Sequence, residues 1–240
     1  MALNLIKTGI KGLDAVLKGG LRQNSSILLT GGPGTGKTIL ALQYICEGAK
    51  LGEAGLYITF EETVESLREY ADSVDLNLRE LEKKGLVTLV QQPISDKKIM
   101  SIAAPLNVIR QKKIKRVALD SLTLFEYMHV AGTMDFRKEV LDFILRMKEA
   151  GVTLLATSQK ATVNFDQLEY QPQDFLFEGV IVLTKVRKSS SFERCLSVVK
   201  LRGQDHLIDI YPFAIKKGGI EIFPKEIPFS LIEQDIEDKK

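Results

Sequence analysis

The sequence predicts an α/β fold with a mostly parallel central sheet, flanking helices and an antiparallel extension at its C-terminal end. Two features of the 240 residues support this prediction. Up to about residue 178, short apolar runs alternate with helical repeats, and strands joined through helices lie parallel with helices on both faces of the sheet. Beyond residue 178, apolar runs follow one another across short turns, which is typical of antiparallel hairpins.

The parallel part depends on short apolar runs that end in glycine or polar residues. We expect its strands at residues 26–30, 55–60, 86–90, 116–119, 152–157 and 179–183, and its helices at 38–50, 64–71, 99–111 and 136–150. In the antiparallel part we expect strands at 180–186, 195–201, 211–216 and 219–223, with no helix between them.

The chain is long enough for one well-buried core, and no stretch has the composition of a linker. We therefore expect one domain over residues 1–232 and a charged, frayed tail over 233–240. Cys46 and Cys195 match no metal-ligand spacing, so we interpret them as free thiols in a reducing compartment. Neither a leader peptide nor a membrane span is visible, and the expected location is the cytoplasm.

Residues 31–38 carry the phosphate-binding motif G-x-x-x-x-G-K-[ST] in the form G-G-P-G-T-G-K-T. Glycines let the backbone turn its N–H groups towards nucleotide phosphates, and the following helix adds its positive end. Lys37 is expected to reach the β- and γ-phosphates, and the Thr38 hydroxyl to coordinate Mg²⁺. The motif follows an expected strand and begins an expected helix, as it requires. We predict that the ATP site contains Gly31, Gly32, Pro33, Gly34, Thr35, Gly36, Lys37, Thr38 and Ile39.

An aspartate, Asp120, ends the apolar run that begins at Arg116. Ligands of open α/β sheets lie beyond the carboxyl ends of the strands, so we expect Asp120 to hold Mg²⁺ through water, together with Thr38. An aspartate in a simple turn is the alternative interpretation. The phosphate-binding motif upstream favours the metal.

Two glutamates, Glu61 and Glu62, follow the strand expected at 55–60. A carboxylate that faces the phosphates from a strand end can orient and deprotonate the attacking water. An acidic first turn of the next helix is the alternative. We favour catalysis, because the strand after such a helix often neighbours the nucleotide-binding strand. Adjacent residues point in different directions, and we rank Glu61 above Glu62 as the base.

Three polar residues, Thr157, Ser158 and Gln159, end another apolar run. A polar side chain at this point could sense the γ-phosphate, or the three residues could form a turn. The sequence leaves both interpretations open.

Several stretches together resemble the KaiC-like branch of the RecA superfamily, and the likeness covers nearly the whole chain. They are K-T-G-I-K-G-L-D-A-V-L-K-G-G-L at 7–21, the phosphate-binding motif, T-F-E-E at 59–62, L-D-S at 119–121, V-K-L-R-G-Q-D-H at 199–206, Y-P-F at 211–213 and G-G-I-E-I-F-P at 218–224. The resemblance implies a RecA-like ATPase fold. KaiC carries two such domains and this chain carries one, so it is similar to the single-domain, stand-alone archaeal members.

The resemblance also implies a hexameric ring with ATP at each subunit interface. In this family the K-L-R-G-x-x-H segment reaches the nucleotide of the neighbouring subunit. Carried over, Lys200 and Arg202 would stand near the γ-phosphate and His206 near the base or sugar. A cation supplied across an interface stabilises the charge that develops in phosphoryl transfer. A solvated strand face and a hairpin cap are the ordinary alternatives for these residues.

The sequence departs from the family pattern at two positions. Lys11 stands where proline is usual, and Asn24 stands where glycine is common. Asparagine tolerates a left-handed backbone, so we expect Asn24 to preserve the turn. The phosphorylation segment of the second KaiC domain is not recognisable, so we do not expect an autokinase cycle.

Three functions remain in view: a slow Mg²⁺-dependent ATPase in a regulatory or signalling role, a nucleotide-switched scaffold that recruits a protein partner, and a RadA- or RecA-like paralogue that acts on DNA. DNA binding is not favoured, because 33 basic residues against 31 acidic ones leave a net charge of only +2. Residues 160–180 also hold one basic residue against four acidic ones, Asp166, Glu169, Asp174 and Glu178. We interpret the basic run at Lys112, Lys113, Lys115 and Arg116 as a helix end.

Overall fold

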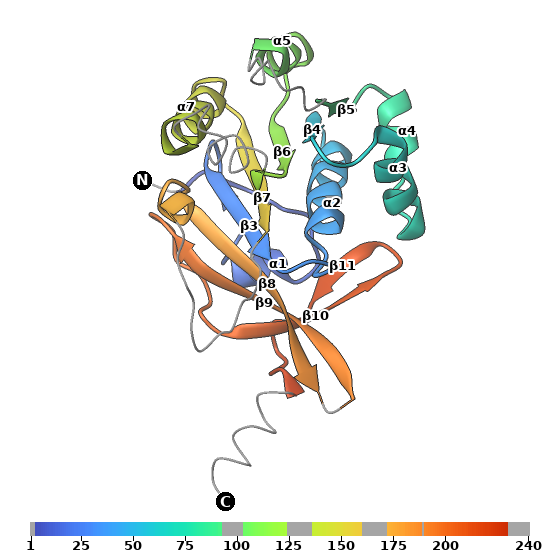
Figure 1. Cartoon of the computed structure of the whole chain (residues 1–240), viewed down its shortest axis with the longest axis vertical. Coiled ribbons are helices and arrows are strands. Elements are labelled where there is room, and N and C mark those ends of the chain that lie inside the picture. Colours follow the sequence, from blue (N-terminus) through green and yellow to red (C-terminus); the bar gives the residue numbers. More distant parts are fainter. Residues whose placement is uncertain (1–2, 93–102, 124–135, 160–171, 189, 230–240) are drawn as a thin grey trace, which may run out of the picture.

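The centre of the fold is a nine-stranded sheet with the order β11-β10-β9-β8-β3-β7-β6-β4-β5 (Figure 1). The computed structural model describes residues 3–92, 103–123, 136–159, 172–188 and 190–229. Neighbouring strands run parallel from β8 to β5, and β9, β10 and β11 continue the sheet in antiparallel fashion. The predicted fold class is therefore confirmed.

The observed strands lie within a few residues of the expected ones. The parallel strands are β3 (Ser26–Gly31), β4 (Gly55–Thr59), β5 (Val87–Gln91), β6 (Arg116–Asp120), β7 (Thr153–Gln159) and β8 (Gly179–Lys188). The antiparallel extension consists of β9 (Ser191–Leu201), β10 (Ile210–Lys216) and β11 (Gly219–Ile222). Two short strands that the sequence did not reveal, β1 (Leu5–Ile6) and β2 (Leu21–Arg22), pair with each other near the N-terminus.

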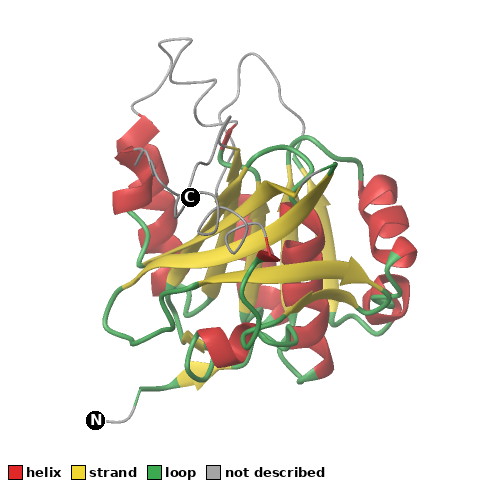
Figure 2. Cartoon of the chain, turned by 90° about the horizontal axis from the view of Figure 1, so that it is seen from below, coloured by secondary structure: helices red, strands yellow, loops and turns green. Residues whose placement is uncertain are grey.

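Helices cover both faces of the sheet (Figure 2). One face packs against α1 (Leu13–Val16), α2 (Lys37–Lys50), α3 (Val64–Ser73) and α4 (Leu78–Lys83). The other packs against α5 (Ala103–Lys112) and α7 (Phe136–Glu149). The short helix α4 was not predicted. The expected helix at 99–111 begins in residues outside the described part of the chain.

The strand order corrects one step of the sequence reasoning. Strand β4, which follows the phosphate-binding helix in sequence, was expected to neighbour β3, but β7 and β6 lie between them. The direct neighbours of β3 are β7 and β8. Residues after β4 still reach the phosphate-binding loop, because all the parallel strands end at the same edge of the sheet.

Arg116 begins strand β6, as expected from the apolar run at 116–119, and so it does not belong to the helix end that the basic run suggested. Its side chain is fully buried in β6 and pairs with Glu53, at 2.5 Å between Nε and Oε2. Its guanidinium also donates to the carbonyls of Lys7, Thr8 and Tyr44. Arg116 therefore joins the N-terminal segment to helix α2, and only Lys112 of the basic run belongs to helix α5.

Several smaller expectations can be compared with the structure. Asn24 has a φ of 60°, so it does preserve a left-handed turn. Cys46 and Cys195 are buried free thiols, and burial raises the pKa of each to about 12. Within the described ranges, no helix is long and apolar enough to span a membrane. The tail 233–240 and residues 160–171 of the acidic stretch at 160–180 lie outside the described residues.

Candidate functional site

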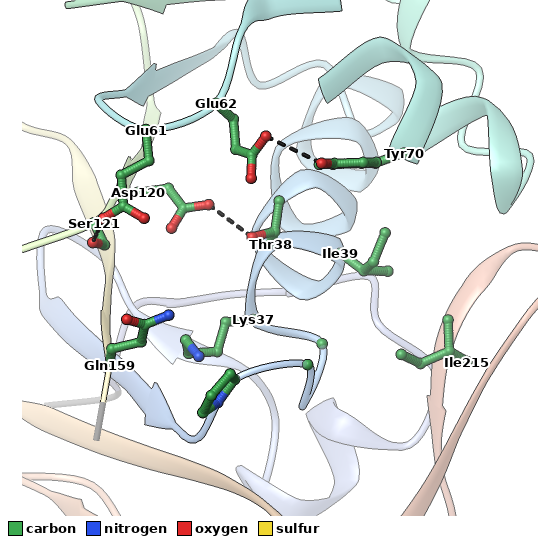
Figure 3. Close-up of a pocket in the computed structure, with 13 residues that line it drawn as sticks. Lys37, Thr38, Ile39, Glu61, Glu62, Tyr70, Asp120, Ser121, Gln159 and Ile215 are labelled. Carbon is green, nitrogen blue, oxygen red and sulfur yellow. Dashed lines mark hydrogen bonds between the residues drawn. The ribbon is translucent and has the colours of Figure 1, made fainter. Parts of the chain in front are cut away.

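A cavity of about 390 Å³ opens where the parallel strands end, next to the loop between β3 and α2 (Figure 3). This volume falls within the usual range for small-molecule sites. The cavity is lined by the loop and helix residues Pro33, Gly34, Gly36, Lys37, Thr38 and Ile39, and by Glu61, Glu62, Tyr70, Asp120, Ser121, Gln159 and Ile215.

The loop backbone has the form that an anion site requires. Gly31 has a φ of 155°, and a Cβ there would meet the Leu183 carbonyl oxygen at 2.2 Å, so β8 leaves no room for a side chain. Gly36 is the N-cap of α2 with a φ of 109°, and no described side chain caps this helix. The first-turn N–H groups of α2 have no intrahelical partner and carry the positive end of the helix dipole, so they suit a phosphate.

The Lys37 ammonium is folded against the loop itself. Its Nζ donates to the carbonyls of Gly31 and Gly32, each at 2.9 Å. Burial lowers the pKa of Lys37, and the carboxylates of Asp120 and Glu61 oppose this shift. The ammonium thus rests on neutral oxygens and has no carboxylate in direct contact within the described chain, so its charge remains available for a phosphate.

Asp120 lies beside the start of α2. Its Oδ2 accepts a hydrogen bond from the Thr38 hydroxyl at 2.9 Å (Figure 3). These two side chains offer a carboxylate and a hydroxyl, the hard oxygen ligands that Mg²⁺ prefers. No group of three or more acidic, histidine or cysteine side chains suited to a metal occurs among the described residues. The pair therefore fits a Mg²⁺ that takes its other ligands from phosphate and water.

The two glutamates after β4 point in different directions, as expected (Figure 3). Glu61 Oε1 accepts a hydrogen bond from the Ser121 hydroxyl at 2.8 Å, which directs it towards Asp120. Glu62 Oε2 accepts one from the Tyr70 hydroxyl at 3.1 Å, which directs it towards α3. Glu61 is thus the glutamate directed towards the Thr38–Asp120 pair and Lys37.

The polar residues at the end of β7 separate into three different environments. Gln159 lines the cavity. The Thr157 hydroxyl is buried and donates to Asp120 Oδ1 at 2.5 Å. The Ser158 hydroxyl is buried and has no hydrogen-bond partner among the residues that the structure describes. Of the three, only Gln159 is placed to contact a ligand in this cavity.

Lys200, Arg202 and His206 lie away from this cavity. Lys200 pairs with Val180 at the start of β8, and β8 begins beside the start of β3. Val180 in turn pairs with Leu28, and the phosphate-binding loop leaves the other end of β3 at Gly31, about 10 Å further along the strand. Lys200 donates to the Asp174 carbonyl at 2.8 Å, and Arg202 to the Phe175 carbonyl at 3.2 Å. Within one chain, these cations do not join the site.

Sequence reasoning missed several residues of this region. Ile215 on β10 lines the cavity, and Tyr57 on β4 donates to Asp120 Oδ2 at 2.6 Å. Burial raises the pKa of Tyr57 well above its usual value, so its hydroxyl remains a donor. Lys185 on β8 lies beside the loop, because a Cβ at Gly34 would be 2.9 Å from its Nζ. No sequence motif marks these residues, since only the strand order brings them to the loop.

Comparison with known proteins identifies the family. The family model described as "ATPase: KaiC" matches residues 6–227. The circadian clock oscillator protein KaiC of Parasynechococcus marenigrum (strain WH8102) is 32% identical over 93% of this chain and 46% of its own length. The protein of the same name from Parathermosynechococcus lividus is 32% identical over 91% of this chain and 42% of its own length. This chain therefore spans about half the length of these relatives.

The match includes the loop, Glu61, Glu62 and Asp120, which lie at the cavity, and also the segment from Lys200 to His206, which lies away from it. A single family model thus covers both the cavity and the two cations Lys200 and Arg202, which lie away from it. The chain belongs to the KaiC ATPase family.

Proposed function

We propose that this protein binds ATP with Mg²⁺ in the cavity and hydrolyses it slowly, as a subunit of a homo-oligomeric ring with a regulatory role. The observation that carries the proposal is the position of Lys37. It is a buried ammonium on two neutral carbonyls, at the N-terminus of α2 and beside the Thr38–Asp120 pair. Positive charge that rests on neutral oxygens suits a polyphosphate chelated by a hard metal ion.

Different residues of the cavity would bind the phosphates, the Mg²⁺ ion and the nucleobase. The N–H groups at the start of α2 and Lys37 would hold the phosphates. Thr38 and Asp120 would hold Mg²⁺, which neutralises phosphate charge when bound. Ile39 and Ile215 give the cavity apolar surface that suits a nucleobase.

Glu61 is the proposed general base. Ser121 holds its carboxylate at the cavity, on the side of Asp120 and Lys37. From there it would orient a water molecule and accept its proton as the water attacks the terminal phosphate. Tyr70 holds Glu62 in another direction, which supports ranking Glu61 first.

The ring is proposed because Lys200 and Arg202 do not line the cavity of their own chain and donate instead to the carbonyls of Asp174 and Phe175. Lys200 and Arg202 would supply charge to the nucleotide of a neighbouring copy, and His206 would contact its base or sugar. A contact between two different surfaces of identical subunits closes into a ring when the rotation permits. The relatives are named as circadian clock oscillator proteins, and this supports a regulatory rather than a metabolic role.

Substitution of Lys37 tests the binding site directly. We expect Lys37→Ala to abolish most of the ATP affinity measured by titration calorimetry with Mg²⁺, because the ammonium that faces the phosphates is lost. Lys50→Ala is the matched control, since Lys50 ends the same helix and pairs with Glu47 on the surface. Full ATP affinity in Lys37→Ala, or an equal loss in both variants, would contradict the proposed site.

A further inference from the structure

Tyr57 lies diagonally across from Asp120 in the sheet. Strand β4 pairs with β6 so that Thr59 is opposite Asp120 and Tyr57 is opposite Ala118. Residues two positions apart on a strand share a face, and an aromatic side chain can reach a diagonal neighbour on the next strand. The Tyr57 ring is fully buried, and its hydroxyl reaches Asp120 Oδ2 at 2.6 Å.

The Asp120 carboxylate accepts hydrogen bonds from three hydroxyls on three elements. Thr38 of α2 and Tyr57 of β4 donate to Oδ2, and Thr157 of β7 donates to Oδ1. Thr38 is itself a proposed metal ligand. Tyr57 and Thr157 flank the carboxylate from the strands on either side of β6, and neither is needed as a metal ligand.

We propose that Tyr57 is a positioning residue for the metal site: its hydroxyl, together with that of Thr157, fixes the Asp120 carboxylate beside Thr38, so that Thr38 can coordinate Mg²⁺ and Asp120 can hold it through water. This inference rests on the proposed function. A carboxylate without these donors is free to rotate about its side-chain torsions, and ordering it would then oppose metal binding. Partners of this kind typically change metal affinity by about 10- to 100-fold.

The alternative is that the Tyr57 hydroxyl merely satisfies a buried polar group. Tyr57→Phe separates the two roles, because it removes one oxygen and keeps the ring. Tyr44→Phe is the matched control. Tyr44 is also fully buried, and its hydroxyl donates to the Thr153 carbonyl at 3.3 Å, not to Asp120.

The test measures ATP affinity by calorimetry in EDTA and in saturating Mg²⁺, for the wild type and both variants. The ratio of the two affinities reports how much the metal strengthens nucleotide binding. We expect Tyr57→Phe to reduce this ratio about tenfold while its affinity in EDTA stays at the wild-type value. Tyr44→Phe should keep the wild-type ratio, even where its melting temperature falls by as much as that of Tyr57→Phe.

A wild-type ratio in Tyr57→Phe would overturn the positioning role. If Tyr57→Phe does not fold, Thr157→Val serves as the second variant, because it removes the donor on the other side of the same carboxylate. It should also reduce the ratio, and an unchanged ratio would overturn the inference. A wild-type protein that binds ATP equally well with and without Mg²⁺ would overturn the metal site itself, and the role of Tyr57 with it.

Discussion

Lysine side chains lie at both ends of the parallel strands, in different surroundings. We call the end with the phosphate-binding loop the loop end, and the end with Lys200 and Arg202 the far end. At the loop end, Lys37 lies on the carbonyls of Gly31 and Gly32, and at the far end Lys200 lies on the carbonyl of Asp174. Burial is the main cause that lowers the pKa of both lysines. Carboxylates act on both lysines, those of Asp120 and Glu61 on Lys37 and that of Asp174 on Lys200, but of the two lysines only Lys37 lines the cavity.

This difference is the basis for the proposed division of roles between subunits. The loop end contains what is needed to hold a nucleotide, whereas Lys200 and Arg202 are absent from the cavity lining among the described residues. A lysine that donates to a neutral backbone carbonyl can exchange that partner for a phosphate, because hydrogen bonds between two charged groups are stronger. We therefore propose that Lys200 and Arg202 act on the cavity of another copy of the chain.

The largest loss of ATP turnover is expected when Lys200 and Arg202 at the far end are both replaced. We predict that the double substitution Lys200→Ala and Arg202→Ala lowers ATP turnover about 10³-fold while ATP still binds, because a cation in trans acts mainly on the transition state. Turnover under saturating ATP and binding by calorimetry check both parts. Lys112→Ala with Lys113→Ala is the control, since it removes two exposed cations elsewhere on the surface. Unchanged turnover in the Lys200 and Arg202 variant would show that the loop end acts alone.

A smaller loss of ATP turnover is expected when Glu61 at the loop end is replaced. We predict that Glu61→Gln keeps ATP binding and lowers turnover by about 10²-fold, in line with the usual contribution of a general base. Glu62→Gln is the matched comparison, because Glu62 lines the same cavity but is hydrogen-bonded to Tyr70 and not to Ser121. A slower Glu62→Gln would reverse the ranking. Wild-type turnover in both variants would favour a nucleotide-switched scaffold or a base elsewhere.

The sequence predicted the parts of the fold that depend on local patterns. The apolar runs located the strands, and the glycine-rich motif located the loop and the start of α2, because both signals lie within a few consecutive residues. The polar ends of β4, β6 and β7 were also found. The roles proposed for Glu61, Lys200 and Arg202 remain predictions.

What the sequence could not predict depends on which strands become neighbours. The wrong placement of β4 beside β3 and the missed hydroxyl of Tyr57 have this common cause, since Tyr57 reaches Asp120 only because β4 lies next to β6. The burial of Arg116 was missed because its ion-pair partner, Glu53, lies far away in the sequence and leaves no local signal. Helix α4 is short and was overlooked for want of a clear apolar repeat.

A mixing experiment tests catalysis across a subunit interface most directly. Lys37→Ala subunits should not bind ATP but keep Lys200 and Arg202, whereas the double variant should bind ATP but lacks these donors. In an equal mixture, about a quarter of the interfaces in a ring join an intact loop to intact donors. We therefore predict that the mixture regains about that fraction of wild-type ATPase activity, although each variant alone is inactive. A mixture that assembles and stays as inactive as its components would contradict catalysis across a subunit interface.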